Sequence, residues 1–201
     1  MKHLLCIASL LAGLSTAAHA QSSCPTAADL PDGIEVRNTF GASEGFYPHA
    51  PGVIRSEYRD GDGQGTQTLL GQGIYWLQNV AVENYESVAS TRITYSYPLD
   101  PQDMPVPTPA GAWNTPVVST ETNGKITQET QSAVFGEMTR LTIGACGYDM
   151  IPVTLEFGPD PYQEVIHYLP DLGLGLLALS KYDTEEPATF VYVAIEKVFG
   201  Q

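Results

Sequence analysis

Two histidines are the first residues in this chain that could do chemistry. His49 lies in the aromatic run FYPH at residues 46–49, and His167 alternates with Ile166 and Tyr168 in a strand-like run. A histidine with an acidic partner can act as a general base, so a hydrolase that uses His49 or His167 is one candidate function. The chain contains no HxH, HExxH or GxSxG motif, however. We therefore expect no catalytic residue and rank the hydrolase last among the functions considered.

A second cluster with chemical potential is the acidic, glycine-rich sequence DGDGQG at residues 60–65. Asp60, Asp62 and Gln64 take positions 1, 3 and 5 of a calcium loop, and Gly65 takes position 6. Position 12 is Gly71 instead of a bidentate carboxylate, which excludes an EF-hand. A simple hairpin tip is the favoured interpretation, with a Ca²⁺ site on Asp60, Asp62 and Gln64 as the alternative. We expect no other cofactor.

Aromatic and aliphatic side chains in strand-like runs form the third candidate site. Trp76, Tyr95, Leu155 and Tyr168 occupy apolar positions of long runs, where they could line a surface for an apolar ligand. The alternative is that aromatic residues simply suit strands.

The elements that position these residues are strands. Within residues 141–180, Ile151, Val153 and Leu155 alternate with polar residues or proline, the period-2 pattern of a strand with one buried face. Pro/Asp/Gly corners at residues 158–161 and 170–173 separate this strand from two more. We expect this stretch to be the centre of the sheet.

The rest of the chain has the same character, with hairpins predicted at DGDGQG and at Asn123-Gly124. Further strands are expected at residues 33–40, 52–59, 66–82, 89–97, 137–145 and 188–198, and a loop at 41–51. Gly71 and Gly73 predict a bend in one long strand over residues 66–82. The best helix candidate, residues 81–90, is short. The pattern therefore predicts an all-β fold with a strongly curved antiparallel sheet and little helix, or else an antiparallel sandwich.

Residues 98–116 contain six prolines and form the longest expected connection. So many prolines exclude a helix or an interior strand, so we expect an ordered crossover loop with Trp113 packed back onto the sheet. We expect residues 21–201 to form one β domain that includes this loop.

The N-terminus predicts export. Lys2 and His3 precede an apolar run at residues 4–13, and Ala18-His19-Ala20 resembles a cleavage site. This organisation is typical of a bacterial Sec-type signal peptide at residues 1–20. The run is too short to span a bilayer, and Cys6 lies within it, which disfavours a lipoprotein. We expect a periplasmic or secreted protein with no membrane span after cleavage.

Export leaves two cysteines, Cys24 and Cys146. In an oxidising compartment such a pair most simply forms one disulfide, here between positions 122 residues apart. A metal-binding or redox-active pair is the alternative, but no CxxC spacing supports it.

The charge of the chain restricts its partners. Nine basic residues stand against 23 acidic ones, a formal net charge of −14, and loss of Lys2 with the leader adds one more negative unit. A field of this sign disfavours nucleic acid and anionic membranes. It is compatible with cations or a basic partner, and it also keeps an exported protein soluble.

Residues 168–174 read YLPDLGL and carry one resemblance. This corner between two strands resembles one found in curved-sheet periplasmic proteins of the lipoprotein-carrier type and related uncharacterised exported families. The resemblance implies a half-open barrel whose concave face can hold an acyl chain. The sequence departs from that type in its proline-rich residues 98–116, its Cys24–Cys146 pair and its lack of clear covering helices.

Taken together, these features predict an exported, non-catalytic protein. It would bind an apolar or lipid-like small molecule on a concave sheet. The alternative is a structural envelope protein that docks another protein, and the second alternative is the hydrolase described above.

Overall fold

The computed structural model describes residues 23–159 and 161–198. The predicted leader, with Cys6, lies outside this range. No helix in the described part of the chain is both long and apolar enough to cross a membrane.

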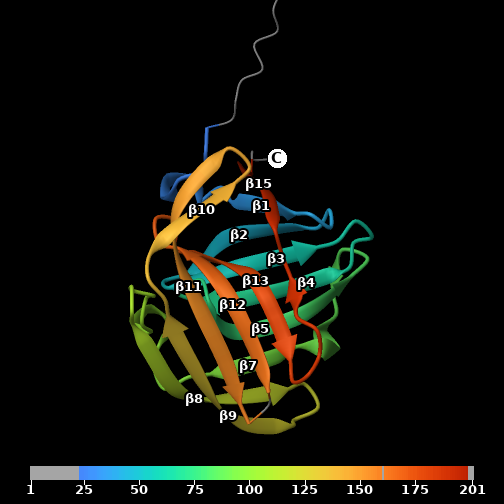
Figure 1. Cartoon of the computed structure of the whole chain (residues 1–201). Coiled ribbons are helices and arrows are strands. Elements are labelled where there is room, and N and C mark those ends of the chain that lie inside the picture. Colours follow the sequence, from blue (N-terminus) through green and yellow to red (C-terminus); the bar gives the residue numbers. More distant parts are fainter. Residues whose placement is uncertain (1–22, 160, 199–201) are drawn as a thin grey trace, which may run out of the picture.

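The chain is all-β, as predicted, and its strands form one large antiparallel sheet (Figure 1). The first strands are β1 (Ile34–Asn38), β2 (Ser43–Ala50), β3 (Val53–Arg59), β4 (Gly65–Gly71), β5 (Tyr75–Glu83), β6 (Glu86–Ser87) and β7 (Ile93–Ser96). The later strands are β8 (Ala112–Glu121), β9 (Ile126–Phe135), β10 (Thr139–Ile143), β11 (Cys146–Gly158), β12 (Tyr162–Leu169), β13 (Leu174–Tyr182), β14 (Ala188–Thr189) and β15 (Tyr192–Lys197). Three single 3₁₀ turns complete the described elements: η1 (Ala27–Asp29), η2 (Ala89–Thr91) and η3 (Pro101–Asp103).

The strand order is mostly a meander, which explains why short turns suffice to connect it. The order across the sheet is β14-β13-β12-β11-β9-β8-β7-β5-β4-β3-β2-β1-β15. β10 pairs only with β11, and the last strand returns to pair with the first. The two edge strands do not pair with each other, and the sheet is neither closed nor strongly curled. The strongly curved, half-open barrel is therefore not what the chain forms. The alternative, an antiparallel sandwich, would have two sheets, whereas the described strands lie on one pairing path.

The sheet has two halves that face one another. In Figure 1, β11–β13 run in front of β2–β5 and cross them steeply, as in an orthogonal packing of two layers. One core cluster joins Phe46 of β2 to Leu174 and Leu176 of β13, and a second joins Tyr75 of β5 to Leu155 of β11. We call β1–β5 the first half and β9 with β11–β13 the second half.

Three details of the secondary structure differ from the sequence prediction. The expected loop at residues 41–51 is wrong, because the chain forms strand β2 there and buries Phe46 in the core. The expected long strand at residues 66–82 is two strands, since Gly73 takes a positive φ and the chain reverses between β4 and β5. Residues 81–90 form no α-helix, because β5 continues to Glu83 and pairs with β6.

The proline-rich segment ends earlier than expected. β8 begins at Ala112 and includes Pro116, although residues 98–116 were expected to lack an interior strand. Pro116 is tolerated because β7 pairs only with residues 118–121 of β8, so no neighbour on that side needs its missing N–H. Trp113 packs back onto the core as predicted, with its ring centroid 4.8 Å from that of Tyr75.

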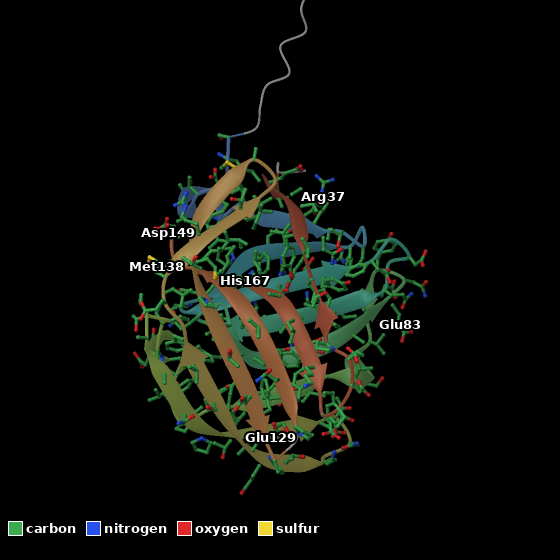
Figure 2. The ribbon with its side chains drawn as sticks, viewed as in Figure 1. Arg37, Glu83, Glu129, Met138, Asp149 and His167 are labelled. Atoms are coloured by element: carbon green, nitrogen blue, oxygen red, sulfur yellow. A yellow bond between two sulfur atoms is a disulfide. The ribbon has the colours of Figure 1, made fainter. Side chains whose placement is uncertain are left out.

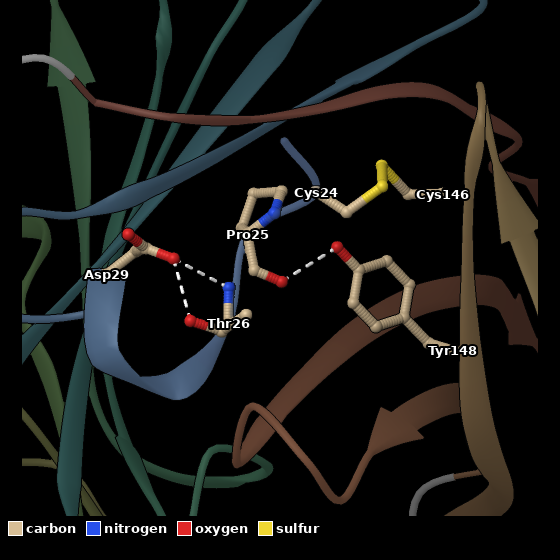
Figure 3. The surroundings of a disulfide bond; sticks show 6 residues. All are labelled: Cys24, Pro25, Thr26, Asp29, Cys146 and Tyr148. Atoms are coloured by element: carbon tan, nitrogen blue, oxygen red, sulfur yellow. Dashed lines mark hydrogen bonds between the residues drawn. A yellow bond between two sulfur atoms is a disulfide. The ribbon is translucent and has the colours of Figure 1, made fainter. Parts of the chain in front are cut away.

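The disulfide between Cys24 and Cys146 is confirmed, with 5.5 Å between the Cα atoms. It fixes the N-terminal segment to the start of β11 (Figure 3). The Tyr148 hydroxyl donates a 3.1 Å hydrogen bond to the carbonyl of Pro25, and Asp29 accepts from both Thr26 groups shown in Figure 3. The entry to the domain is thus held covalently and by hydrogen bonds.

Candidate functional site

A cavity of about 400 Å³ lies between the two halves. Strands β2–β5 supply one wall, and β12, β13 and the segment that leads into β15 supply the other. Its apolar lining consists of Leu70, Ile74, Trp76, Ile166, Leu177 and Phe190. This space is partly open to solvent and lies beside the two packed core clusters.

The same cavity has a polar side that carries two carboxyl groups. Its titratable lining residues are Glu44, Tyr58, Tyr162, Glu164 and Tyr192. No lysine, arginine or histidine lines it within the described chain. We call this space the acidic cavity.

Strand geometry explains why these side chains meet. Side chains two residues apart point to one face of a strand. Ser56 and Tyr58 share a face of β3, and Tyr162, Glu164 and Ile166 share a face of β12. The period-2 pattern of β12 therefore places the Glu164 carboxyl group on the same inward face as the apolar side chain of Ile166.

Glu44 is held by two hydroxyl groups. The Ser56 hydroxyl donates to its Oε1, and the Tyr192 hydroxyl donates to its Oε2 at 3.4 Å. Burial raises the pKa of Glu44 from 4.5 to about 7, against these two hydrogen bonds, which lower it. Burial is the larger effect because no cation compensates the charge.

Glu164 is more deeply buried, with 1% of its surface exposed. The Tyr162 hydroxyl donates to its Oε1 at 2.7 Å, while its Oε2 has no hydrogen-bond partner. Burial raises the pKa of Glu164 to about 7, the Tyr162 hydrogen bond lowers it, and the charge of Glu44 raises it. The two carboxyl groups belong to opposite halves of the sheet, and the charge of Glu44 affects the protonation of Glu164.

Two of the four residues predicted to bind a ligand lie at or beside the acidic cavity. Trp76 is part of its wall. Tyr95 is not part of the wall but packs edge to face against Trp76, with the two ring centroids 5.7 Å apart. Burial raises the pKa of the Tyr95 hydroxyl to about 12, and Glu129 and Glu164 add to that shift.

The other two predicted ligand residues lie in the packed core. Leu155 is fully buried on β11, directly opposite Glu164 of β12. Tyr168 is buried on β12, one inward position beyond Ile166. Neither is part of the cavity lining, and ligand contact by any of the four residues stays a prediction.

The two histidines do not meet at the cavity. His49 is exposed on β2, and His167 lies half-buried on β12 (Figure 2), where burial lowers its pKa. Neither forms an ion pair with a carboxylate in the part of the chain that the structure describes. The arrangement of His49 and His167 in the described chain therefore does not support a hydrolase that uses either of them.

The DGDGQG sequence forms a turn that Asp60 closes. Asp60 Oδ1 accepts hydrogen bonds of 2.9 Å from the backbone N–H groups of Asp62 and Gln64. Among residues 23–159 and 161–198 no group of three or more His, Cys, Asp or Glu side chains is placed to hold a metal. A Ca²⁺ site on Asp60, Asp62 and Gln64 stays a prediction.

Glu44 and Glu164 were not among the predicted site residues. Glu164 could have been found, because it alternates with Ile166 and Tyr168 and is the acidic residue on a buried face. Glu44 gave no such signal, since its segment was expected to be a loop.

No protein-family model matches this chain, and no curated protein matches it. Among solved structures it is similar to the crystal structure of the hypothetical lipoprotein YmcC from Escherichia coli K12. The TM-score is 0.44 and the identity 14%, over 83% of this chain and 89% of that one. A likeness of this size carries no argument about fold or function, and the resemblance to carrier-type periplasmic proteins stays a prediction.

Proposed function

We propose that this chain is an exported envelope protein that binds a small molecule with an apolar body in the acidic cavity. The cavity carries the proposal. Its volume of about 400 Å³ falls in the range of about 300–1,000 Å³ that small-molecule sites occupy. Its mixture of an apolar wall with a few polar groups is also typical of such sites.

The energetics of the fold support the same conclusion. Apolar side chains on the wall of this open space lack the packing contacts of a filled core, and that lack costs stability. Two carboxyl groups without a cationic partner add to that cost, because burial disfavours their charged forms. A ligand that fills the space and interacts with the carboxyl groups would offset both costs.

The envelope location is supported by the disulfide and by the predicted leader. A Cys24–Cys146 bond persists in oxidising compartments and is rare in the cytosol. The cavity favours ligand binding over the partner-docking alternative, which needs no space of this kind inside the protein. The hydrolase is not favoured, because neither His49 nor His167 lines the cavity.

Calorimetric titration with decan-1-ol, a neutral apolar probe, tests the proposal. Leu177→Trp places a larger side chain in the cavity wall and should weaken binding by roughly tenfold or more. Val134→Trp adds the same group at an exposed position of β9 and is the matched control. Equal affinity of wild type and Leu177→Trp would show that the probe does not use the cavity, and would overturn the proposal.

A further inference from the structure

The acidic cavity has an imbalance of charge that a purely apolar ligand would not use. Glu44 enters from β2 in the first half, and Glu164 enters from β12 in the second half. The remaining titratable groups that face them are Tyr58 of β3, Tyr162 of β12 and Tyr192 of β15. The lining residues from β4, β5 and β13 carry no charge.

We infer that the ligand is an organic cation, a protonated amine on an apolar body, whose charge binds between Glu44 and Glu164. This inference rests on the proposed function, because it names the chemical class of ligand for the same cavity. A buried carboxylate is stable only with a partner, and the described chain supplies no cationic one here.

The hydrogen bonds at the two carboxyl groups fit a cation as the missing partner. Ser56 and Tyr192 occupy one oxygen each of Glu44, and Tyr162 occupies Oε1 of Glu164. All three donors are hydroxyl groups, which orient the carboxyls as acceptors. The buried Oε2 of Glu164 lacks a donor, and an ammonium group carries up to three N–H donors. Because this oxygen has almost no accessible surface, the Glu164 side chain must turn toward the cavity for one of these donors to reach it.

The aromatic lining fits the same ligand. Trp76, Tyr162, Phe190 and Tyr192 present rings to the cavity beside the two carboxyl groups. Aromatic faces attract ammonium groups through their quadrupoles, and they also pack against an apolar body. An anionic ligand, such as a fatty acid carboxylate, would be repelled by both features.

A divalent metal ion fits this cavity less well than an amine. Calcium takes six to eight oxygen ligands, most of them from carboxylates and carbonyls. The cavity offers two carboxyl groups, and no third acidic, histidine or cysteine side chain is grouped with them in the described chain.

Binding of a cation here should be linked to protons. Burial places the pKa values of both carboxyl groups near neutrality, and a bound cation lowers them again. At pH 5.5 only about 3% of a group with a pKa of about 7 is ionised, so affinity should fall by roughly 30-fold for each carboxylate that the cation needs. Near pH 7 the complex should release protons as it forms.

Calorimetric titration with three probes of equal chain length tests the inference: decylamine, decan-1-ol and decanoate. At pH 8 decylamine should bind at least roughly tenfold more tightly than decan-1-ol, with decanoate the weakest. At pH 5.5 the preference should disappear. Titration of decylamine at pH 7 in buffers of different ionisation enthalpy should show proton release, which decan-1-ol should not produce.

Variants assign the effect to the two carboxyl groups. Glu164→Gln, Glu44→Gln and the double variant should each lose preference for decylamine while they still bind decan-1-ol. Glu137→Gln removes the same charge at an exposed site on the surface and should behave as wild type. Circular dichroism of each variant shows whether it folds, and the proton-release measurement needs only the wild-type protein.

The outcomes separate the two proposals. Equal affinity for decylamine and decan-1-ol at pH 8, with no proton release, would overturn the inference that the ligand is a cation. It would leave the proposed apolar binding site intact. Tight binding of decylamine that survives the double variant would also overturn it. Failure of all three probes to bind would instead overturn the proposed function itself.

Discussion

The hydroxyl of Tyr162 donates a 2.7 Å hydrogen bond to Glu164, two residues further along the same face of β12. This pair shows how the fold supports a carboxyl group in its interior. One oxygen of Glu164 is satisfied by its own strand, and the other has no partner. The hydrogen bond therefore orients the carboxyl group, but no cation balances its charge in the described chain. This unbalanced charge should make the stability of the protein depend on pH.

Removal of the Glu164 charge should stabilise the ligand-free protein at alkaline pH. Because the pKa of Glu164 is raised to about 7 in the fold, the folded state binds more protons than the unfolded state between about pH 4.5 and 7. The contribution of Glu164 to the free energy of unfolding therefore falls as pH rises through this window. The free energy of unfolding of Glu164→Gln should exceed that of the wild type by about 3 kcal/mol at pH 8, and the two values should be equal near pH 4.5.

Urea unfolding at the two pH values measures this difference. Glu137→Gln, an exposed position, corrects for the change in net charge. A wild-type protein as stable as Glu164→Gln at pH 8 would show that the fold does not penalise this carboxylate.

The Tyr162 hydroxyl should hold the pKa of Glu164 down. Tyr162→Phe removes the donor and keeps the ring, so the pKa of Glu164 should rise further. Loss of this bond should also cost about 1–3 kcal/mol of unfolding free energy at pH 8, because a buried acceptor loses its donor. NMR titration of carbon-13-labelled glutamate side chains reads the pKa directly. Tyr182→Phe, at a half-exposed ring, is the control, and an unchanged Glu164 titration in Tyr162→Phe would contradict the prediction.

The two halves of the sheet should tolerate no side chain at Gly175. Its N–H donates to the carbonyl of Gly73 at 3.1 Å, across the interface of the halves. A Cβ atom there would lie 2.6 Å from Ile74 Cγ2 and 2.7 Å from Ile166 Cγ2. We expect Gly175→Ala to lower the free energy of unfolding by about 1–3 kcal/mol in chemical denaturation.

Gly61→Ala is the matched control for that substitution. A Cβ atom at Gly61 would have no neighbour within 4 Å. If both variants unfold at the same denaturant concentration, the halves are less closely apposed than their backbones indicate.

The disulfide should contribute a large share of the stability. Cys24→Ser/Cys146→Ser removes it without leaving a free thiol, and we expect a loss of about 2–5 kcal/mol, because the bond restricts a long segment of the unfolded chain. Denaturation of the wild type with and without reductant gives the same comparison. A double variant as stable as the oxidised wild type would mean that the Tyr148–Pro25 hydrogen bond and its neighbours suffice to hold the N-terminal segment.

Some features followed from local patterns in the sequence. Asn123-Gly124 gave the β8–β9 hairpin, because only a few dipeptides suit a tight turn. The alternation around Val153 gave β11, because side-chain direction reverses at each residue of a strand. Cys24 and Cys146 gave the disulfide, since they were the two cysteines left outside the leader.

Other features could not be obtained in this way. The segment predicted as a loop at residues 41–51 forms β2, because pairing with both β1 and β3 holds it extended. Gly71 and Gly73 predict only a bend where the structure has the turn between β4 and β5, because glycines do not indicate how far the chain reverses. Leu155 and Tyr168 were correctly expected to be apolar and inward, but sequence does not distinguish a filled core from the wall of a cavity.

The sequence by itself determined the all-β class, most of the turns and the covalent link, because each depends on neighbouring residues or on a single pair. Only the tertiary structure decided that Glu44 and Glu164 line one cavity. The two residues lie in opposite halves of the sheet, and their proximity depends on which strands pair and on how the halves pack. That arrangement buries Glu164 and partly buries Glu44, and the loss of solvation gives both carboxyl groups their raised pKa values and their proposed affinity for a cation.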